Sequence, residues 1–258
     1  MTALLPEPAT LILITLFAVF ATFAHGYSGF GFGLTAMTLF TFLSYDIERL
    51  SVVISFIGLA STIALMIASR KIGRIQWKRA IPLIIGNTSG MPLGYLFLVT
   101  YGQKPVFGLV LGIILILYSA YGLSGKIISK TLPNYAGVPI GLGAGFIGGA
   151  FVSGGPPMVM FLYSQAEDPR ELKSTIQVVF LLGITARLLV VLFGPVGITG
   201  EIGLLAFITI PICLPAMLLG HFLSKRHSSE FFKKAVYYII GTFGVIMILK
   251  STLLLLRG

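Results

Sequence analysis

The sequence predicts an all-α, polytopic membrane protein with inverted repeats, in which each repeat is a broken-helix hairpin followed by three transmembrane helices. The first observation is composition, because 56% of the 258 residues are hydrophobic and only 10% are charged, more than one soluble core needs. The second is length, since several apolar runs reach the roughly 20 residues that cross a bilayer. The third is a pair of glycine-rich interruptions, one in each half of the chain.

The first repeat is expected at residues 1–123. Residues 9–43 are too long for one span and are cut by glycines between Gly26 and Gly33, so we expect two helices of unequal length that enter and leave on the same side. The amino terminus lacks the basic region of a signal peptide, and we therefore expect the first apolar run to be retained. The expected spans after the hairpin are 50–69, 80–101 and 105–123.

The second repeat is expected at residues 135–258, after a cytoplasmic linker at 124–134. Residues 136–164 are again too long for one span, and a glycine-rich stretch around Gly154 and Gly155 divides them into a longer and a shorter arm. This pattern predicts a second same-side hairpin. The expected spans after it are 174–193, 201–223 and 235–255.

The basic residues orient this arrangement, because cytoplasmic loops retain Lys and Arg. If loop 70–79 is cytoplasmic, successive crossings place 13 of the 18 basic residues on the same side, whereas a plan without hairpins scatters them. We therefore expect a multi-pass protein of the cell membrane with both termini outside the cytoplasm. The net charge of +10 then reflects membrane orientation, and we expect no nucleic-acid partner. The only cysteine, Cys213, excludes an internal disulfide.

The two halves align with each other. Gly33 and Gly155 lie 122 residues apart, and the same spacing aligns Asp46 with Asp168. Each hairpin enters and leaves on the same side, so each repeat crosses the membrane three times in net terms. Because three is odd, the second repeat should have the opposite orientation in the membrane to the first. The charges agree, because the basic loop 70–79 corresponds to an uncharged turn in the second half. The alternative is chance similarity between two leucine-rich membrane sequences, against which the charge inversion argues.

The interruptions also carry a family resemblance. They read Gly29-Phe-Gly-Phe-Gly33 and Gly148-Gly-Ala-Phe-Val-Ser-Gly-Gly-Pro156, and proline-containing spans follow in both halves. In these motifs, and over essentially the whole chain, the sequence resembles the TauE/SafE sulfite exporter family. The resemblance implies a membrane protein that moves sulfur-containing anions such as sulfite, sulfoacetate and other organosulfonates.

The two interruptions predict an anion site. A helix that begins inside the membrane exposes unpaired N–H groups and the positive end of its dipole, which lipid cannot satisfy. Short helices beginning after Gly33 and after Gly155, with Pro156 at the first helical position, would direct these ends at a shared cavity. The alternative is that the glycines only allow helices to pack closely. The expected substrate contacts, from backbone amides and hydroxyls, are Ser28, Gly31, Gly33, Leu34, Thr35, Ser153, Gly154, Gly155 and Met158.

Two polar side chains inside expected spans extend this site. Arg187 lies where an unpaired cation is costly and usually functional, so it could neutralise the anion. The alternatives are that Arg187 snorkels to the membrane surface or pairs with Glu201. Asn87, which begins the polar patch Asn87-Thr-Ser89, could line the substrate path.

Four residues are candidates for ion coupling or for capping. His25 and His221 titrate near neutrality and could carry a coupled proton, with packing as the alternative. Asp46 and Asp168 occupy equivalent loop positions, and we expect each to cap the helix that follows, with proton coupling as the alternative for Asp46. Proton and sodium coupling both stay open. We expect no metal site and no cofactor.

The function expected from these observations is a secondary transporter of small sulfur-containing anions, which works by alternating access and is not an enzyme. A passive anion channel is the closest alternative. An intramembrane serine protease is another, because Gly26-Tyr-Ser-Gly29 fits a Gly-x-Ser-Gly pattern. That pattern arises by chance in glycine-rich sequence, and a duplicated architecture has no need of a single nucleophile.

Overall fold

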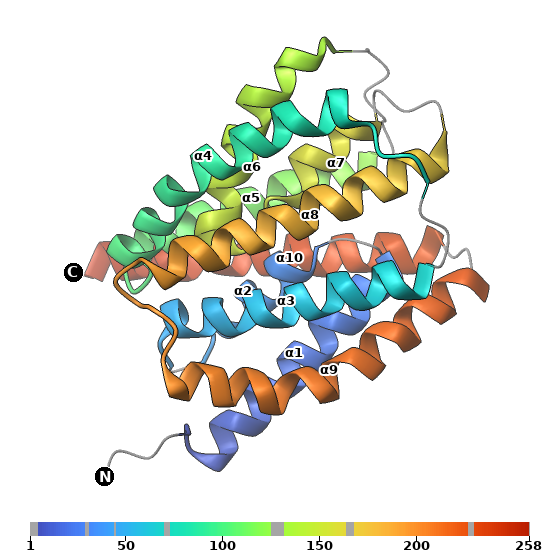
Figure 1. Ribbon diagram of the computed structural model, residues 1–258. Helices are drawn as coiled ribbons and strands as arrows, with labels where there is room; N and C mark the ends of the chain where they lie inside the picture. The colour runs from blue at the N-terminus through green and yellow to red at the C-terminus, as the bar shows by residue number, and fades with distance from the viewer. Residues whose placement is uncertain are drawn as a thin grey trace.

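The computed structural model describes residues 5–28, 31–43, 45–69, 73–124, 132–163, 168–226 and 230–257 (Figure 1). Within these ranges the chain is almost entirely helical and forms no strand. The elements in chain order are α1 (Pro8–Ser28), α2 (Phe32–Phe40), α3 (Ile47–Ser69), α4 (Trp77–Tyr101), α5 (Pro105–Ser124), the 3-10 helix η1 (Asn134–Ala136), α6 (Gly137–Phe151), α7 (Gly155–Tyr163), α8 (Pro169–Leu192), α9 (Gly200–Arg226) and α10 (Glu230–Arg257).

Seven helices in the described part of the chain are long and apolar enough to cross a membrane. They are α1, α3, α4, α5, α8, α9 and α10. The helices α2 and α7 have nine residues each and are too short to cross. The protein is therefore an all-α, multi-pass membrane protein.

Among the helices that begin before their predicted apolar runs, α3 and α8 begin at capping aspartates. The α8 helix begins at Pro169 because the Asp168 carboxylate accepts the Arg170 N–H at 2.8 Å, whereas the apolar run begins at 174. In the same way the Asp46 carboxylate accepts the Glu48 N–H at 3.0 Å at the start of α3. The expected capping roles of Asp46 and Asp168 are confirmed. Hydropathy missed these first turns because they carry charged residues outside the membrane core.

Helices α4 and α6 pack along each other through glycines. A methyl group added at Gly86 would stand 2.1 Å from the Val138 carbonyl oxygen, and one added at Gly94 would stand 2.0 Å from that of Phe146. Glycine is therefore required for the two backbones to approach this closely. Because the contacts advance along both helices together, α4 and α6 run in the same direction. The glycines of α6 that face α4 in return are Gly141, Gly145 and Gly149.

A second close pair joins α1 to α9. A methyl group at Gly26 would stand 2.0 Å from the Met217 carbonyl oxygen, and one at Gly220 would stand 2.3 Å from that of Phe23. These helices also run in the same direction (Figure 1).

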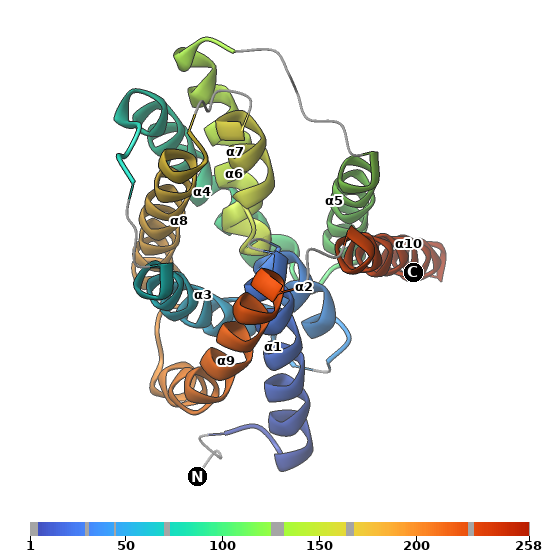
Figure 2. The ribbon, with the colours of Figure 1, turned by 90° about the vertical axis from the view of Figure 1, so that its right-hand side faces the viewer.

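The third pair, α5 and α10, runs in opposite directions. Gly108 near the start of α5 lies against Ser251 near the end of α10, and Ser119 near the end of α5 donates to the Tyr237 carbonyl at 2.8 Å. Figure 2 shows this pair together at one side of the other helices. The two short helices lie among the remaining long ones, and all nine residues of α2 are buried.

Candidate functional site

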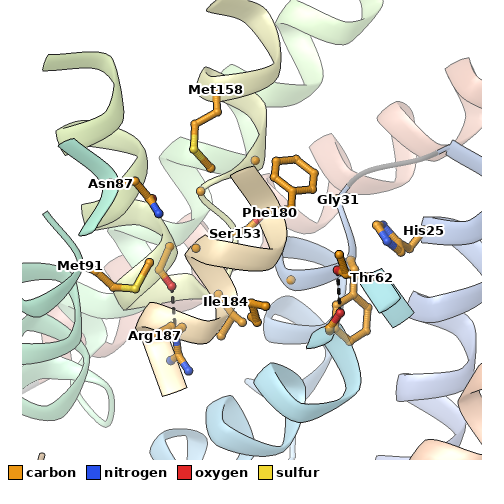
Figure 3. Close-up of a pocket in the computed structure, with 18 residues that line it drawn as sticks. His25, Gly31, Thr62, Asn87, Met91, Ser153, Met158, Phe180, Ile184 and Arg187 are labelled. Atoms are coloured by element: carbon orange, nitrogen blue, oxygen red, sulfur yellow. Dashed lines mark hydrogen bonds between the residues drawn. The ribbon is translucent and has the colours of Figure 1, made fainter. Parts of the chain in front are cut away.

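A pocket lies where the two helix interruptions meet (Figure 3). Residues from α1, α2, α3, α4, α6, α7 and α8 line it. Its polar side chains are His25, Thr62, Asn87, Ser153 and Arg187, and its larger apolar side chains are Phe32, Met91, Met158, Phe180 and Ile184.

The first interruption presents the start of α2 to this pocket. Gly31 precedes the helix with a φ of 84°, a left-handed conformation that glycine adopts without strain. The first helical hydrogen bond runs from the Thr35 N–H to the Gly31 carbonyl at 3.0 Å. The N–H groups of Phe32, Gly33 and Leu34 therefore have no partner within the helix.

This geometry changes two expectations. The α2 helix begins at Phe32 and not after Gly33, so Gly33 lies inside the first turn. The Thr35 amide was expected to contact the anion, but it donates to Gly31 and is not free to do so. Phe32, which the sequence did not single out, has an N–H group without a partner within the helix.

The second interruption presents the start of α7. The α6 helix ends at Phe151, and Val152 follows with a φ of 56°, an unusual and strained conformation for a β-branched residue. The α7 helix begins at Gly155, so Pro156 occupies the second helical position and not the first. Because Pro156 and Pro157 lack N–H groups, Gly155 alone supplies a donor in the first three positions of α7.

The two interruptions touch at Gly33. A methyl group there would stand 1.9 Å from the Val152 carbonyl oxygen and 3.1 Å from the Ser153 Cβ. Any side chain at position 33 would therefore push α2 away from the turn between α6 and α7. The glycine allows both interruptions to border one pocket.

Arg187 forms the charged part of the pocket wall and is 1% exposed. Its Nε donates to the Gly148 carbonyl at 3.1 Å and one Nη to the Gly149 carbonyl at 3.3 Å, near the end of α6. Its remaining donors reach the Ser51 carbonyl at 3.2 Å, the Ser51 hydroxyl at 3.1 Å and the Ser55 hydroxyl. Arg187 on α8 thereby joins α3 to the end of α6.

The surroundings of Arg187 exclude both alternative roles. The guanidinium is buried and does not snorkel. It does not pair with Glu201, whose carboxylate binds Arg49 at 2.7 Å and accepts from the Tyr45 hydroxyl. All five acceptors of Arg187 are neutral, so they satisfy its donors without cancelling its charge.

Asn87 points from α4 into the pocket between Met91 and Met158 (Figure 3). Its side chain is 2% exposed. The next two residues of the expected polar patch, Thr88 and Ser89, are exposed and are not among the described residues that line the pocket.

The structure brings most of the expected site residues together. Gly31, Gly33, Ser153, Gly154, Gly155, Met158, Asn87, Arg187 and His25 all line the pocket. The side chain of Ser28 lies outside the described residues. Leu34, Thr35, His221 and Asp46 lie outside the pocket lining that the described residues form.

Sequence reasoning missed part of the α8 face. Phe180, Gly183 and Ile184 line the pocket with Arg187. They precede Arg187 by seven, four and three residues, which places all four on one face of a helix. Helical periodicity around Arg187 could therefore have predicted these three residues from the sequence alone.

No group of three or more His, Cys, Asp or Glu residues that could hold a metal ion occurs within the described residues. The side chains and backbone groups that line the pocket offer electrostatic attraction and hydrogen bonding. A buried guanidinium and the free N–H groups of two helix starts favour an anion.

Comparisons with known proteins agree with this chemistry. A family model described as "Sulfite exporter TauE/SafE" matches residues 14–247. A protein of Cupriavidus necator named "Probable sulfite/organosulfonate exporter TauE" is 24% identical over 241 residues, which cover 91% of this chain and 90% of that protein. No solved structure gives a significant match. Since the family model covers most of its length, the chain belongs to the TauE/SafE family of sulfite exporters.

Proposed function

We propose that the protein is a secondary transporter that moves small sulfur-containing anions, such as sulfite, sulfoacetate or other organosulfonates, across the cell membrane by alternating access. The observation that carries the proposal is the pocket in which the buried Arg187 and the starts of α2 and α7 converge. The similar protein of Cupriavidus necator, which is named as a probable sulfite or organosulfonate exporter, supports the substrate class.

The charges of the pocket support an anionic substrate. Arg187 is surrounded by neutral acceptors, and among the described residues no carboxylate lines the pocket. A charge in a poorly solvated site acts more strongly than the same charge in water. The N–H groups of Phe32 and Gly33, which line the pocket, can donate hydrogen bonds to a sulfonate or sulfite oxygen.

The directions of the helices support two inverted copies. The helix α5 is the last helix of the first copy and α10 is the last helix of the second, and the two run in opposite directions. The helix α4 of the first copy pairs with α6 of the second, and the equivalent helix α9 of the second copy pairs with α1 of the first. Within each of these pairs the two helices run in the same direction. In transporters, inverted copies of this kind allow one half to rock against the other around a central site.

Contacts between loops and helix ends support the proposed orientation. At one end of the molecule the Gly73 N–H donates to the Ser174 hydroxyl at 2.7 Å, beside the basic stretches that we assign to the cytoplasm. At the other end Arg49 of α3 pairs with Glu201 of α9. We place both termini outside the cytoplasm on this basis.

Coupling to protons is proposed through His25 only. It lies in the last turn of α1 and lines the pocket, with its ring centroid 6.0 Å from that of Phe32. His221 and Asp46 do not share this position. Membership in an exporter family favours transport over the serine protease alternative.

The test is flux of labelled sulfite and labelled sulfonate into proteoliposomes, with and without a proton or sodium gradient. Accumulation against the substrate gradient supports a coupled carrier, while equilibration alone indicates a passive channel. Arg49→Ala is the matched control for Arg187→Lys, because the Arg49 ion pair is partly exposed and Arg49 is not among the residues that line the pocket. Absence of any anion-dependent flux would contradict the proposal.

A further inference from the structure

We infer that Asn87 makes the pocket selective for an oxyanion that also carries a hydroxyl group. The inference rests on the proposed function, because it names a feature of the anion that occupies the same site. The observation behind it is a buried carboxamide on the pocket wall whose oxygen has no partner among the described residues.

The position of this carboxamide is fixed from three sides. The Asn87 backbone lies against Gly145 of α6, where an added methyl group would stand 2.1 Å from the Asn87 carbonyl oxygen. A methyl group at Gly183 of α8 would stand 2.9 Å from Nδ2, and one at Gly154 would stand 3.5 Å from Oδ1. The side chain therefore extends between α8 and the second interruption, in space that two glycines leave open.

The carboxamide oxygen needs a hydrogen-bond donor. A buried polar atom without a partner is energetically costly, so such atoms in folded proteins are usually bonded to protein, water or ligand. Asn87 Oδ1 is buried, and the described residues offer it no hydrogen bond. Since Asn87 lines the pocket, a ligand in the pocket can supply the missing donor.

A hydroxyl group fits this requirement better than an ammonium group. Arg187 already places one uncompensated positive charge on the pocket wall, and no carboxylate among the described lining residues would balance a second. A hydroxyl is neutral, and it both donates and accepts. It can therefore pair with the Asn87 carboxamide whichever way the oxygen and nitrogen are turned.

Two sulfonates of equal size test the inference. Isethionate (2-hydroxyethanesulfonate) and propane-1-sulfonate have the same number of non-hydrogen atoms and differ by a hydroxyl in place of a methyl group. Binding of each to the purified full-length protein is measured by isothermal titration calorimetry. We expect isethionate to bind at least about tenfold more tightly, because a site with a buried polar group rejects ligands that leave it unpaired.

The variants show whether Asn87 causes the preference. Asn87→Leu should reduce the preference for isethionate to less than about threefold. Its affinity for propane-1-sulfonate should stay within about threefold of that of the unmodified protein. Gly183→Ala should also reduce the preference for isethionate, because its methyl group would displace the Asn87 carboxamide without removing it. Thr88→Val is the control, because Thr88 is the exposed neighbour of Asn87 on the same helix and should keep the full preference.

The outcomes separate this inference from the proposed function. Equal affinity of the unmodified protein for the two sulfonates overturns the role of Asn87 and leaves anion transport intact. Binding of neither sulfonate, together with absence of sulfite flux, overturns both. If Asn87→Leu does not fold, Gly183→Ala still tests the role of Asn87, because its methyl group would stand 2.9 Å from Nδ2 and displace the amide; an unchanged preference in that variant overturns the inference.

Discussion

At the scale of single residues, Arg187 combines a structural and an electrostatic role. Its donors are satisfied by the Gly148 and Gly149 carbonyls and by Ser51 and Ser55, so it joins α8 to α6 and α3. Its charge is not cancelled by these neutral partners. A lysine cannot reproduce this set of bonds, because its ammonium has three donors on one atom.

Replacement of Arg187 therefore has two expected effects. Arg187→Met should lower the free energy of unfolding by about 2–4 kcal/mol, because buried carbonyls and hydroxyls lose their donors, and should weaken anion binding at least about tenfold. Thermal unfolding with and without sulfonate measures both. Arg49→Ala should change stability by about 1 kcal/mol or less and leave binding unchanged, because its ion pair is partly exposed. Anion affinity that survives Arg187→Met in folded protein would remove Arg187 from the site.

Gly33 is the residue at which the two interruptions touch. Gly33→Ala would place a methyl group 1.9 Å from the Val152 carbonyl oxygen, so we expect it to reduce transport at least about tenfold or to prevent folding. Gly143→Ala is the matched control, because nothing lies within 4 Å of the added methyl group on α6. That change should leave flux intact and stabilise the helix by up to about 1 kcal/mol. Equal activity of the two variants would show that the contact at Gly33 is not needed.

At the scale of secondary structure, the sequence predicted the glycine interruptions better than the atoms they expose. Glycine and proline mark where a helix cannot continue, and the two short helices begin within two residues of the expected points. The exact first residue decides which N–H groups are free, however, and tertiary contacts set it. Thr35 was for this reason assigned wrongly and Phe32 was missed.

The pairing of helices was not predictable from hydropathy. A stripe of glycines such as Gly86, Gly90 and Gly94 indicates a close neighbour, but it does not say that α6 is that neighbour. Asn87 became interpretable only when the fold placed it beside Gly154 of the second interruption and Gly183 of α8. Periodicity identifies a helix face, and only the fold identifies what the face contacts.

The starts of α3 and α9 are joined by a small polar cluster. Burial, together with a hydrogen bond to Glu201, raises the pKa of Tyr45 to about 12, so Tyr45 is protonated at neutral pH and donates to that carboxylate. Because the pKa in the folded state lies above the ordinary value of 10, the stabilisation is complete below pH 10 and is lost as pH rises toward 12. Over this pH range, the midpoint temperature of thermal unfolding should fall more steeply for the native protein than for Tyr45→Phe. Parallel curves would contradict this role of Tyr45.

At the scale of the whole molecule, the proposal places two copies in opposite orientations with both termini outside. The only cysteine, Cys213, is buried, so the native chain is a suitable background for cysteines introduced one at a time. In right-side-out membranes, Gln103→Cys and Thr199→Cys should react with an impermeant maleimide. Arg74→Cys and Lys173→Cys should react only after the membrane is opened. The reverse pattern would invert the orientation, and a mixed one would contradict the two-copy plan.

The central claim is that a sulfur oxyanion binds where the starts of α2 and α7 meet beside Arg187. The most direct measurement is an anomalous-diffraction map of crystals grown with 2-bromoethanesulfonate, in which the bromine marks the ligand. The account predicts a bromine peak inside this pocket, with the sulfonate oxygens within hydrogen-bonding distance of the amides of Phe32 and Gly33. A ligand found only elsewhere, with this pocket holding no anion, would contradict it.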